Sequence, residues 1–205
     1  MKTAIFARHG ESEFSVRGDV NGDPTVACAL TATGKEQARR LGEEIAAEPI
    51  ELCVVTEFGR TRETADIALR GRDDVPRLVV PELNDIRFGE FEGKPLDVYR
   101  AWAGANLPTT DAPGGGESRA ATVLRYVRGY RSLLERPGET ILVVAHGLPI
   151  RYALSALRGE YPAPIVEQVA YAVPYRFDAG ELRLAAERLE AWAANPVWPR
   201  AAARG

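Results

Sequence analysis

The amino-acid sequence predicts an α/β fold in which helices cover both faces of a mostly parallel central sheet. Short apolar runs rich in strand-forming residues alternate along the chain with longer segments whose apolar residues recur at helical spacing. Continuous apolar runs are typical of strands that are buried on both faces, as in a parallel sheet between two helical layers. The predicted architecture is therefore a three-layer α/β/α arrangement.

The composition fits one folded domain. The chain has 205 residues, of which 45% are hydrophobic and 27% are charged, which is typical of globular proteins and unlike disordered ones. No internal repeat and no shift in composition marks a boundary. Residues 1–205 are therefore predicted to form a single domain.

The first half of the chain alternates strands with helices. Strands are predicted at residues 3–7, 52–55 and 78–80, and helices from Thr31 or Thr33 to about Ala47, over 59–69 and over about 96–103. The segment 10–29 is rich in Gly, Asp, Asn and Ser and is predicted to be a long loop. Long loops in compact domains are often functional.

The second half continues the pattern. The sequence predicts a helix from Glu117 or Ser118 to about Glu135, a strand over 141–145, a helix entered through Pro149, and two late strands around 169–177 and 182–186. The tail, from about residue 190 to Gly205, is predicted to be mobile.

Charge and cysteine content exclude several classes. The formal net charge is -3 and no basic stripe is present, which disfavours nucleic acid as a partner. No segment reaches the roughly 20 apolar residues of a membrane span, and the N-terminus lacks a secretory signal, so a cytoplasmic protein is expected. Cys28 and Cys53 show no metal-ligand spacing, and neither a metal nor a cofactor is expected.

Both histidines of the chain directly follow a predicted strand. His9 stands in Ala7-Arg8-His9-Gly10 and His146 in Ala145-His146-Gly147. Ligands of open α/β sheets bind in the crevice outside the carboxyl ends of the strands. A single histidine at a strand end can be purely structural, but two in matched settings predict one shared site.

The tripeptide Arg8-His9-Gly10 suits phosphoryl transfer. A neutral imidazole is a good nucleophile toward phosphorus, and the resulting phosphohistidine passes the group on. The guanidinium of Arg8 can bind phosphate oxygens, and its charge lowers the pKa of the neighbouring imidazole. Gly10 allows the backbone to approach an anion closely.

Two further segments complete a candidate site. Arg60 stands at the start of a predicted helix, where backbone N–H groups favour an anion. The loop 84–93 holds Asp85, Glu90 and Glu92, any of which could protonate a leaving alkoxide, and the spacing does not choose among them. The glycines before Ser118 lack the lysine of a P-loop and are interpreted as a turn that leads into a helix.

Taken together, these segments resemble the histidine phosphatase superfamily, in the branch named for cofactor-dependent phosphoglycerate mutase. The matching motifs follow one another in order over about residues 3–152: Arg-His-Gly-Glu-Ser at 8–12, Leu-Thr to Gln-Ala at 30–38, Arg-x-x-x-Thr-Ala at 60–65, the acidic loop at 85–93, Gly-Gly-Glu-Ser at 115–118 and His-Gly at 146–147. The resemblance implies a phosphoglycerate mutase-like α/β/α fold.

The resemblance also implies a role for each matching residue. His9 would be the nucleophile, Asp85 the general acid and base, and His146 a stabiliser of the phosphoryl group. The substrate phosphate would be held by Arg8, Arg60, Ser15, Asn21 and Gly147, without a metal. The sequence departs from the family at Asp85, where glutamate is usual, at Ser15, where asparagine is usual, and at 27–29, where Asp-x-Pro is usual.

The predicted function is a metal-independent hydrolase of a small phosphorylated metabolite that acts through phosphohistidine on His9. A phosphoglycerate mutase is the first alternative, disfavoured because the segment between Gly93 and Gly114 is short and has only Lys94 and Arg100 as basic residues. The second is a catalytically weak phosphate-binding or regulatory protein. No membrane partner is expected, and the sequence does not determine whether the protein forms a homo-oligomer. Four aromatic residues are candidates either for the wall of the substrate pocket or for ordinary packing: Tyr99, Trp102, Tyr161 and Tyr171.

Overall fold

The computed structural model describes residues 1–199, and its five strands form one sheet. The strands are β1 (Thr3–Arg8), β2 (Ile50–Val55), β3 (Arg77–Val79), β4 (Thr140–Ala145) and β5 (Pro174–Asp178), in the order β3-β2-β4-β1-β5. The first four are parallel, and β5 runs antiparallel along β1 at one edge. The predicted α/β class with a mostly parallel central sheet is confirmed.

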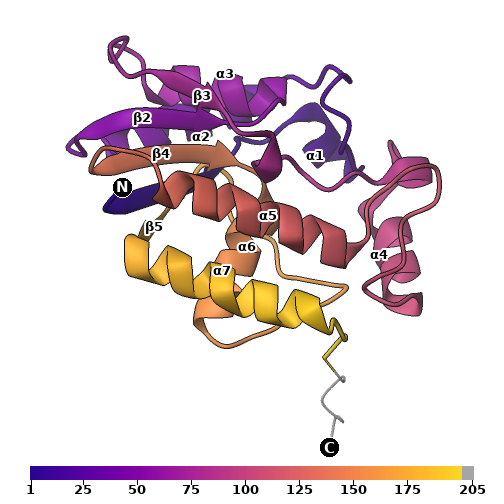
Figure 1. Ribbon diagram of the computed structural model, residues 1–205. Helices are drawn as coiled ribbons and strands as arrows, with labels where there is room; N and C mark the ends of the chain where they lie inside the picture. The colour runs from indigo at the N-terminus through magenta and orange to yellow at the C-terminus, as the bar shows by residue number, and fades with distance from the viewer. Residues whose placement is uncertain (200–205) are drawn as a thin grey trace, which may run out of the picture.

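Helices cover both faces of this sheet (Figure 1). One face carries α2 (Ala32–Glu44) and α3 (Gly59–Ala68), and the other carries α5 (Arg119–Leu134), α6 (Gly147–Leu157) and α7 (Ala179–Ala194). Successive side chains of β1 enter different cores: Ile5 packs with Leu41 of α2, whereas Phe6 packs with residues of α5 and α7. Burial on both faces explains why the strands are uninterrupted apolar runs.

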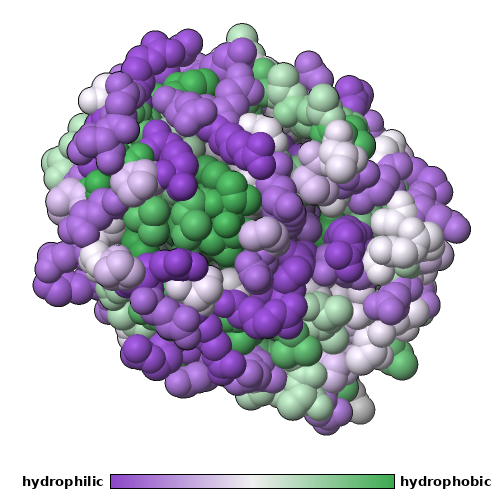
Figure 2. All heavy atoms as spheres, turned by 45° about the horizontal axis from the view of Figure 1, so that its top comes forward, coloured by the Kyte–Doolittle hydropathy of each residue, from purple (hydrophilic) through white to green (hydrophobic). Residues whose placement is uncertain are grey.

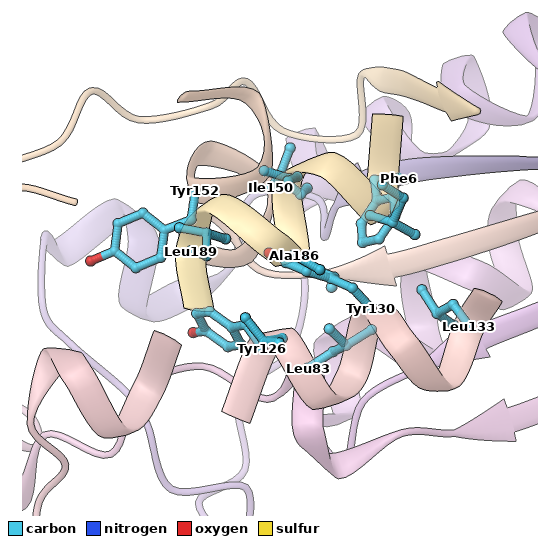
Figure 3. Close-up of a cluster of buried hydrophobic side chains, with 14 of the residues drawn as sticks. Phe6, Leu83, Tyr126, Tyr130, Leu133, Ile150, Tyr152, Ala186 and Leu189 are labelled. Carbon is cyan, nitrogen blue, oxygen red and sulfur yellow. The ribbon is translucent and has the colours of Figure 1, made fainter. Parts of the chain in front are cut away.

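The larger core joins three helices to β1 (Figure 3). Tyr130 of α5, Ile150 of α6 and Leu189 of α7 gather near Phe6. The Phe6 ring makes edge contacts with Tyr130 and Phe177 at centroid distances of 6.1 and 5.3 Å. Aromatic pairs of this geometry add to the free energy of burial, so the core fixes β1, whose carboxyl end carries His9.

One predicted late strand is wrong. Residues 182–186 lie within α7, which begins at a capping box in which Asp178 accepts from the Glu181 backbone at 2.7 Å. Leu182, Ala186 and Leu189 are buried at the three- to four-residue spacing of a helix, and a segment of five residues is too short to distinguish the two periods. The other predicted strand, 169–177, is realised only as β5.

The predicted loop over 10–29 contains a short helix, α1 (Glu13–Arg17), capped by Ser12 and ended by Gly18 at φ 74°. The connection from β3 to α5 contains two 3-10 turns, η1 (Pro81–Leu83) and η2 (Gly89–Phe91), and α4 (Leu96–Ala105). In Figure 1, α1 and α4 lie on the side toward which β4 points. They stand where the crevice was predicted.

The first part of the segment predicted to be a mobile tail is helical and packed in the structure. Helix α7 continues to Ala194, and its residue Trp192 is 5% exposed. The indole of Trp198 donates to the Asn106 carbonyl at 2.8 Å, so this segment packs against the end of α4. Residues 200–205 of the predicted tail lie outside the described residues.

The surface seen in Figure 2 is mostly hydrophilic, and its most extensive apolar area lies left of the centre, framed by hydrophilic residues, with smaller apolar areas near the lower edge. Across residues 1–199, none of the helices combines the length and the apolar character that crossing a membrane requires.

Candidate active site

The sheet brings the two histidines together. β1 and β4 are neighbours, Arg8 is in register with Ala145, and the backbone N–H of His9 donates to the Ala145 carbonyl at 3.0 Å. The imidazole centroids of His9 and His146 lie 5.4 Å apart, and the residues are 4% and 0% exposed. The parallel pairing of two strands that lie far apart in the sequence therefore creates one buried site.

The hydrogen bonds of His9 define its tautomer. Its Nδ1 lies 2.7 Å from the Gly10 carbonyl, which can only accept, so Nδ1 carries the proton. Its Nε2 accepts from Nε of Arg60 at 3.1 Å. Burial, reinforced by the charges of Arg60 and Arg8, lowers the pKa of His9 well below its usual range. The imidazole is therefore neutral, with the Nε2 lone pair directed toward Arg60.

Arg60 connects most of the predicted site residues. Its Nη1 donates to Oδ1 of Asn21 at 2.5 Å and its Nη2 to the Asn21 carbonyl at 3.0 Å. The same Nη2 lies 3.3 Å from Nδ1 of His146 and 3.6 Å from Oδ2 of Asp85. Asn21 thus orients Arg60, since both of its oxygens accept from this guanidinium.

Arg8 holds a donor that lacks an acceptor. Its Nη1 donates to the Val169 carbonyl at 3.0 Å and its Nη2 to the Tyr171 hydroxyl at 3.1 Å. Its Nε is buried without a partner among residues 1–199. A Cβ on Gly147, the first residue of α6, would lie 3.6 Å from this Nε. A buried donor beside a helix N-terminus is suited to an anion.

Gly10 serves packing, which corrects the interpretation from the sequence. Its N–H donates to Oγ1 of Thr64 at 3.0 Å, so this amide already has an acceptor. A Cβ at position 10 would lie 2.4 Å from the Gly34 carbonyl oxygen. The glycine lets the His9 loop pack closely against the start of α2.

Among the three acids of loop 84–93, only Asp85 reaches the histidines. Its Oδ2 lies 3.6 Å from Nδ1 of His146. Glu92 accepts from the backbone of Gly22 and Phe88 at 2.8 and 2.9 Å, and Glu90 is exposed. Burial raises the pKa of Asp85, and the charge of Arg60 opposes this shift.

His146 is supported by two threonines that the sequence analysis did not single out. Its Nε2 lies 3.0 Å from Oγ1 of Thr56, which lies 3.0 Å from Oγ1 of Thr61. Burial and the charge of Arg60 lower the pKa of His146 well below its usual range. Thr56 directly follows β2, so its position at a strand end is the signal that could have found it.

These residues open into a cavity of about 530 Å³, a size typical of sites for small organic ligands. Its wall includes Ser15, whose Oγ lies 2.9 Å from Oγ of Ser12. Tyr99 and Tyr171 also line it. The other two aromatic candidates do not: Trp102 stacks on Phe91 and Tyr99, and Tyr161 is 62% exposed.

The site geometry agrees with a known family. Residues 4–172 match the model of the histidine phosphatase superfamily, branch 1. The chain belongs to this superfamily. The match covers most of the chain, including both histidines, Arg60 and Asp85, so the resemblance found in the sequence is confirmed.

Named relatives of this histidine phosphatase include both mutases and phosphatases. A 2,3-bisphosphoglycerate-dependent phosphoglycerate mutase of Methylobacterium sp. (strain 4-46) is 32% identical over 170 residues, which cover 76% of this chain and 80% of the relative. The adenosylcobalamin/alpha-ribazole phosphatase of Escherichia coli (strain K12) is 32% identical over 149 residues, which cover 68% and 70%. Equal identity to both leaves the phosphoryl acceptor undecided.

A solved structure supports the same assignment. The alpha-ribazole phosphatase from Shigella flexneri matches with a TM-score of 0.71 and 26% sequence identity, over 85% of this chain and 89% of that one. Phosphatases thus occur among both the relatives and the structural neighbours. This chain is an enzyme of the histidine phosphatase family.

A buried ion pair holds the loop that carries Asp85. Arg125 of α5 donates to both carboxylate oxygens of Glu117 at 2.8 Å. Its remaining N–H groups donate to the carbonyls of Glu82, Asn84 and Asp85 at 3.0, 2.8 and 3.0 Å. All five N–H groups of this guanidinium therefore have acceptors, three of them in the backbone around Asp85.

Arg125→Gln is expected to destabilise this histidine phosphatase and to displace Asp85, the candidate acid. Removing one partner of a buried pair costs about 3–5 kcal/mol, which lowers the Tm by roughly 10 °C in a chain of this size. Turnover of alkyl phosphates should fall more than that of aryl phosphates, because only the former need an acid. Arg128→Gln, exposed on the same helix, is the control for both measurements, and an unchanged Tm in Arg125→Gln contradicts the expectation.

The pKa shifts predict an acidic pH optimum for alkyl phosphates. If Asp85 is the general acid, it must be protonated to donate, so kcat/KM should fall as pH rises through the pKa that burial has raised. If His9 is the nucleophile, it must be neutral, and its lowered pKa keeps the imidazole neutral even in mildly acidic solution. A pH profile of kcat/KM tests this, because Asp85→Asn should lose the basic limb; an unchanged limb assigns it to another group.

No metal centre is evident in the part of the chain that the structure describes. Among residues 1–199, no three or more His, Cys, Asp or Glu side chains are grouped so that they could hold a metal ion. Cys53 is buried in the core, and Cys28 is only partly exposed. The charge that could offset a phosphate in this site comes from Arg8 and Arg60.

Proposed function

We propose that this histidine phosphatase is a metal-independent phosphomonoesterase that passes the phosphoryl group of a small metabolite to His9 and then to water. The observation that carries the proposal is the Nε2 lone pair of His9, held by a bond from Arg60 at 3.1 Å. Arg8, which directly precedes His9, has a buried Nε without an acceptor among residues 1–199. A nucleophile and donors for the phosphate oxygens therefore meet in one buried place.

The first step would form a covalent intermediate. A phosphate ester enters the cavity and its oxygens accept from Arg8, Arg60 and the N-terminus of α6. The Nε–H of Arg60 turns from Nε2 of His9 to a phosphate oxygen, which frees the lone pair. Nε2 then attacks phosphorus, a P–N bond forms, and the ester P–O bond breaks. The leaving alkoxide takes the proton of the Asp85 carboxyl group, which leaves a carboxylate and a phosphohistidine.

The second step would reverse these proton transfers. The carboxylate of Asp85 accepts a proton from water as the water oxygen attacks phosphorus. The P–N bond breaks, inorganic phosphate leaves, and His9 and Asp85 return to their starting forms. Throughout, the two guanidiniums and His146 stabilise charge on the equatorial oxygens, a contribution that is usually large because the donors are already in place.

His146 can donate to a phosphate oxygen only if its Nδ1 carries the proton. Its lowered pKa implies a neutral ring with one proton. In the structure Nη2 of Arg60, which can only donate, lies 3.3 Å from Nδ1, so Nδ1 accepts and the proton is on Nε2, 3.0 Å from Oγ1 of Thr56. The donor role proposed for His146 therefore requires Arg60 to turn toward the phosphate and the Thr56 hydroxyl to donate to Nε2, which moves the proton to Nδ1.

Chelation should leave the activity unchanged. Phosphate release from an aryl phosphate is expected to be the same within error before and after exhaustive treatment with a metal chelator, because arginines supply the positive charge. A loss that added Mg²⁺, Mn²⁺ or Zn²⁺ restores would contradict metal independence. Complete inactivity on aryl phosphates would instead favour a phosphate-binding or regulatory protein.

A mutase is the second candidate, because relatives of similar identity bear that name. The two chemistries share the phosphohistidine and differ in whether water or a second hydroxyl takes the phosphoryl group. Transfer between positions of phosphoglycerate that depends on 2,3-bisphosphoglycerate would establish the mutase. Phosphate release without it, in a panel that includes phosphoglycerates and alpha-ribazole phosphate, supports the phosphatase.

A further inference from the structure

A buried arginine in the cavity wall has no carboxylate partner. Arg119, the first residue of α5, is 6% exposed. Its Nε donates to the Tyr99 hydroxyl at 3.0 Å, its Nη1 to the Tyr152 hydroxyl at 2.8 Å and its Nη2 to the Pro164 carbonyl at 3.2 Å. No Asp or Glu side chain of residues 1–199 makes an ion pair with it.

This placement is unfavourable for a guanidinium. A buried charge is costly unless an opposite charge accompanies it, and the N-terminus of a helix disfavours a cation. The first turn of α5 contains no acidic residue that would compensate. Residues that break such rules are concentrated at functional sites, and Arg119 lines the cavity that contains His9.

Arg119 also retains donors. A guanidinium has five N–H groups, and three of them are used in the contacts with Tyr99, Tyr152 and Pro164. The other two, one on Nη1 and one on Nη2, have no acceptor in the described part of the chain. Two N–H groups on neighbouring terminal nitrogens are the donor set that binds a carboxylate or a phosphate through two oxygens.

A second guanidinium lines the same cavity. Arg100 of α4 contacts only Asp97 as an acid, at 3.2 Å, and the Asp97 side chain is 89% exposed. Exposed pairs of this kind contribute little. Of the acids of the cavity wall, Asp85 pairs with Arg60 and Asp19 with Arg17, and the Glu167 side chain, beside Arg151, is 83% exposed.

Most of the remaining cavity wall is apolar. Phe88, Leu96, Leu148 and Val166 contribute to it. A volume of about 530 Å³ leaves space for an organic group beside the phosphate. The cavity therefore combines the phosphoryl site at His9, an apolar wall, and two guanidiniums without a buried acidic partner.

We propose that Arg119 and Arg100 form a second anion subsite, and that the substrate is a phosphomonoester whose apolar body carries a further acidic group. This inference rests on the proposed function, because it assigns the part of the substrate that is not transferred. The part that is not transferred would carry a negative charge, and an apolar link would join it to the phosphate.

Matched substrates test the charge directly. Phosphate release is measured for alkyl phosphates of increasing chain length that end in methyl, carboxylate, phosphate or ammonium. At one length, kcat/KM should be about tenfold or more higher with the acidic end than with methyl, mainly through KM, and lowest with ammonium. The carboxylate and phosphate series show which acid the subsite prefers.

Variants assign the preference to the residue. Arg119→Gln should abolish the advantage of the acidic end and change kcat/KM for the methyl series by less than about threefold, and Arg100→Gln should reduce the advantage. Arg119→Lys, which keeps the charge but not the paired donors, should retain part of it. Arg128→Gln, on the exposed face of the same helix, should behave as the unmodified protein. Thermal unfolding confirms that each variant is folded.

Two results would overturn the proposal. One is the absence of any preference for an acidic end at every chain length. The other is an equal loss on the methyl and acidic series in folded Arg119→Gln, which would make Arg119 only a support for the loop at Pro164. If no phosphate ester is hydrolysed at all, the proposed function fails, and calorimetric binding of alkylphosphonates with and without a terminal carboxylate decides the subsite independently.

Discussion

His9→Ala is expected to lower kcat/KM for an aryl phosphate by about 10⁴-fold or more. In the proposed mechanism the imidazole supplies the bond-forming lone pair, and the Asp85 carboxylate, which lies 3.6 Å from Arg60 and from His146, is assigned to proton transfer instead. Steady-state phosphate release measures the loss. The Tm should change little in comparison, because the lost contacts are those with Gly10 and Arg60.

Trapping of the intermediate identifies the residue that attacks phosphorus. Brief exposure to labelled substrate followed by a quench should yield a phosphoryl group that is acid-labile and base-stable, as expected of phosphohistidine. His146→Gln, which keeps the nucleophile, should still form it at a reduced rate. Label that persists in His9→Ala would show that another residue is the nucleophile.

The second large effect is expected for Asp85→Asn. Loss of a general acid costs about 10²–10⁴-fold in turnover, and this loss should appear with alkyl phosphates, whose leaving groups need a proton. An aryl phosphate with a good leaving group should lose less than about tenfold, because its departure needs little assistance. The ratio of the two kcat/KM values isolates the acid role from binding.

Two neighbouring acids supply the controls for this experiment. Glu90→Gln should leave both substrates unaffected, since Glu90 is exposed. Glu92→Gln should lower the Tm and reduce both activities alike, since its carboxylate accepts from the backbone of Gly22 and Phe88. Equal losses on both substrates in Asp85→Asn would remove it from the acid role.

The sequence predicted those parts of the fold whose signals are local. β1 and β4 were recognisable because each is a continuous apolar run, and His9 and His146 were recognisable because each follows such a run. Segment 182–186 was assigned wrongly because the spacing of its apolar residues fits both a strand and a helix. In the structure a capping box at Asp178 begins the helix that contains this segment. The short helix α1 was missed because a single turn carries no period.

The choice among the acids shows where local signals end. Asp85, Glu90 and Glu92 are equivalent by spacing, and one loop presents them in three different directions. The direction of Asp85 depends on Arg125, which is forty residues away along the chain and donates to the Asp85 carbonyl at 3.0 Å. The sequence placed Glu117 only at the start of a helix, whereas the structure shows it paired with that arginine.

The sequence by itself determined the mostly parallel sheet, the two strand ends that carry histidine and the family to which the motifs belong. Each of these features depends on short segments of consecutive residues. The tertiary structure alone decided that Asn21 holds Arg60 and that Arg119 is buried without a counter-charge, and it placed Asp85, which the family resemblance had already selected, within 3.6 Å of His146. These facts depend on side chains that meet across the fold, where the burial and the bonds of each group are set by segments distant in the chain.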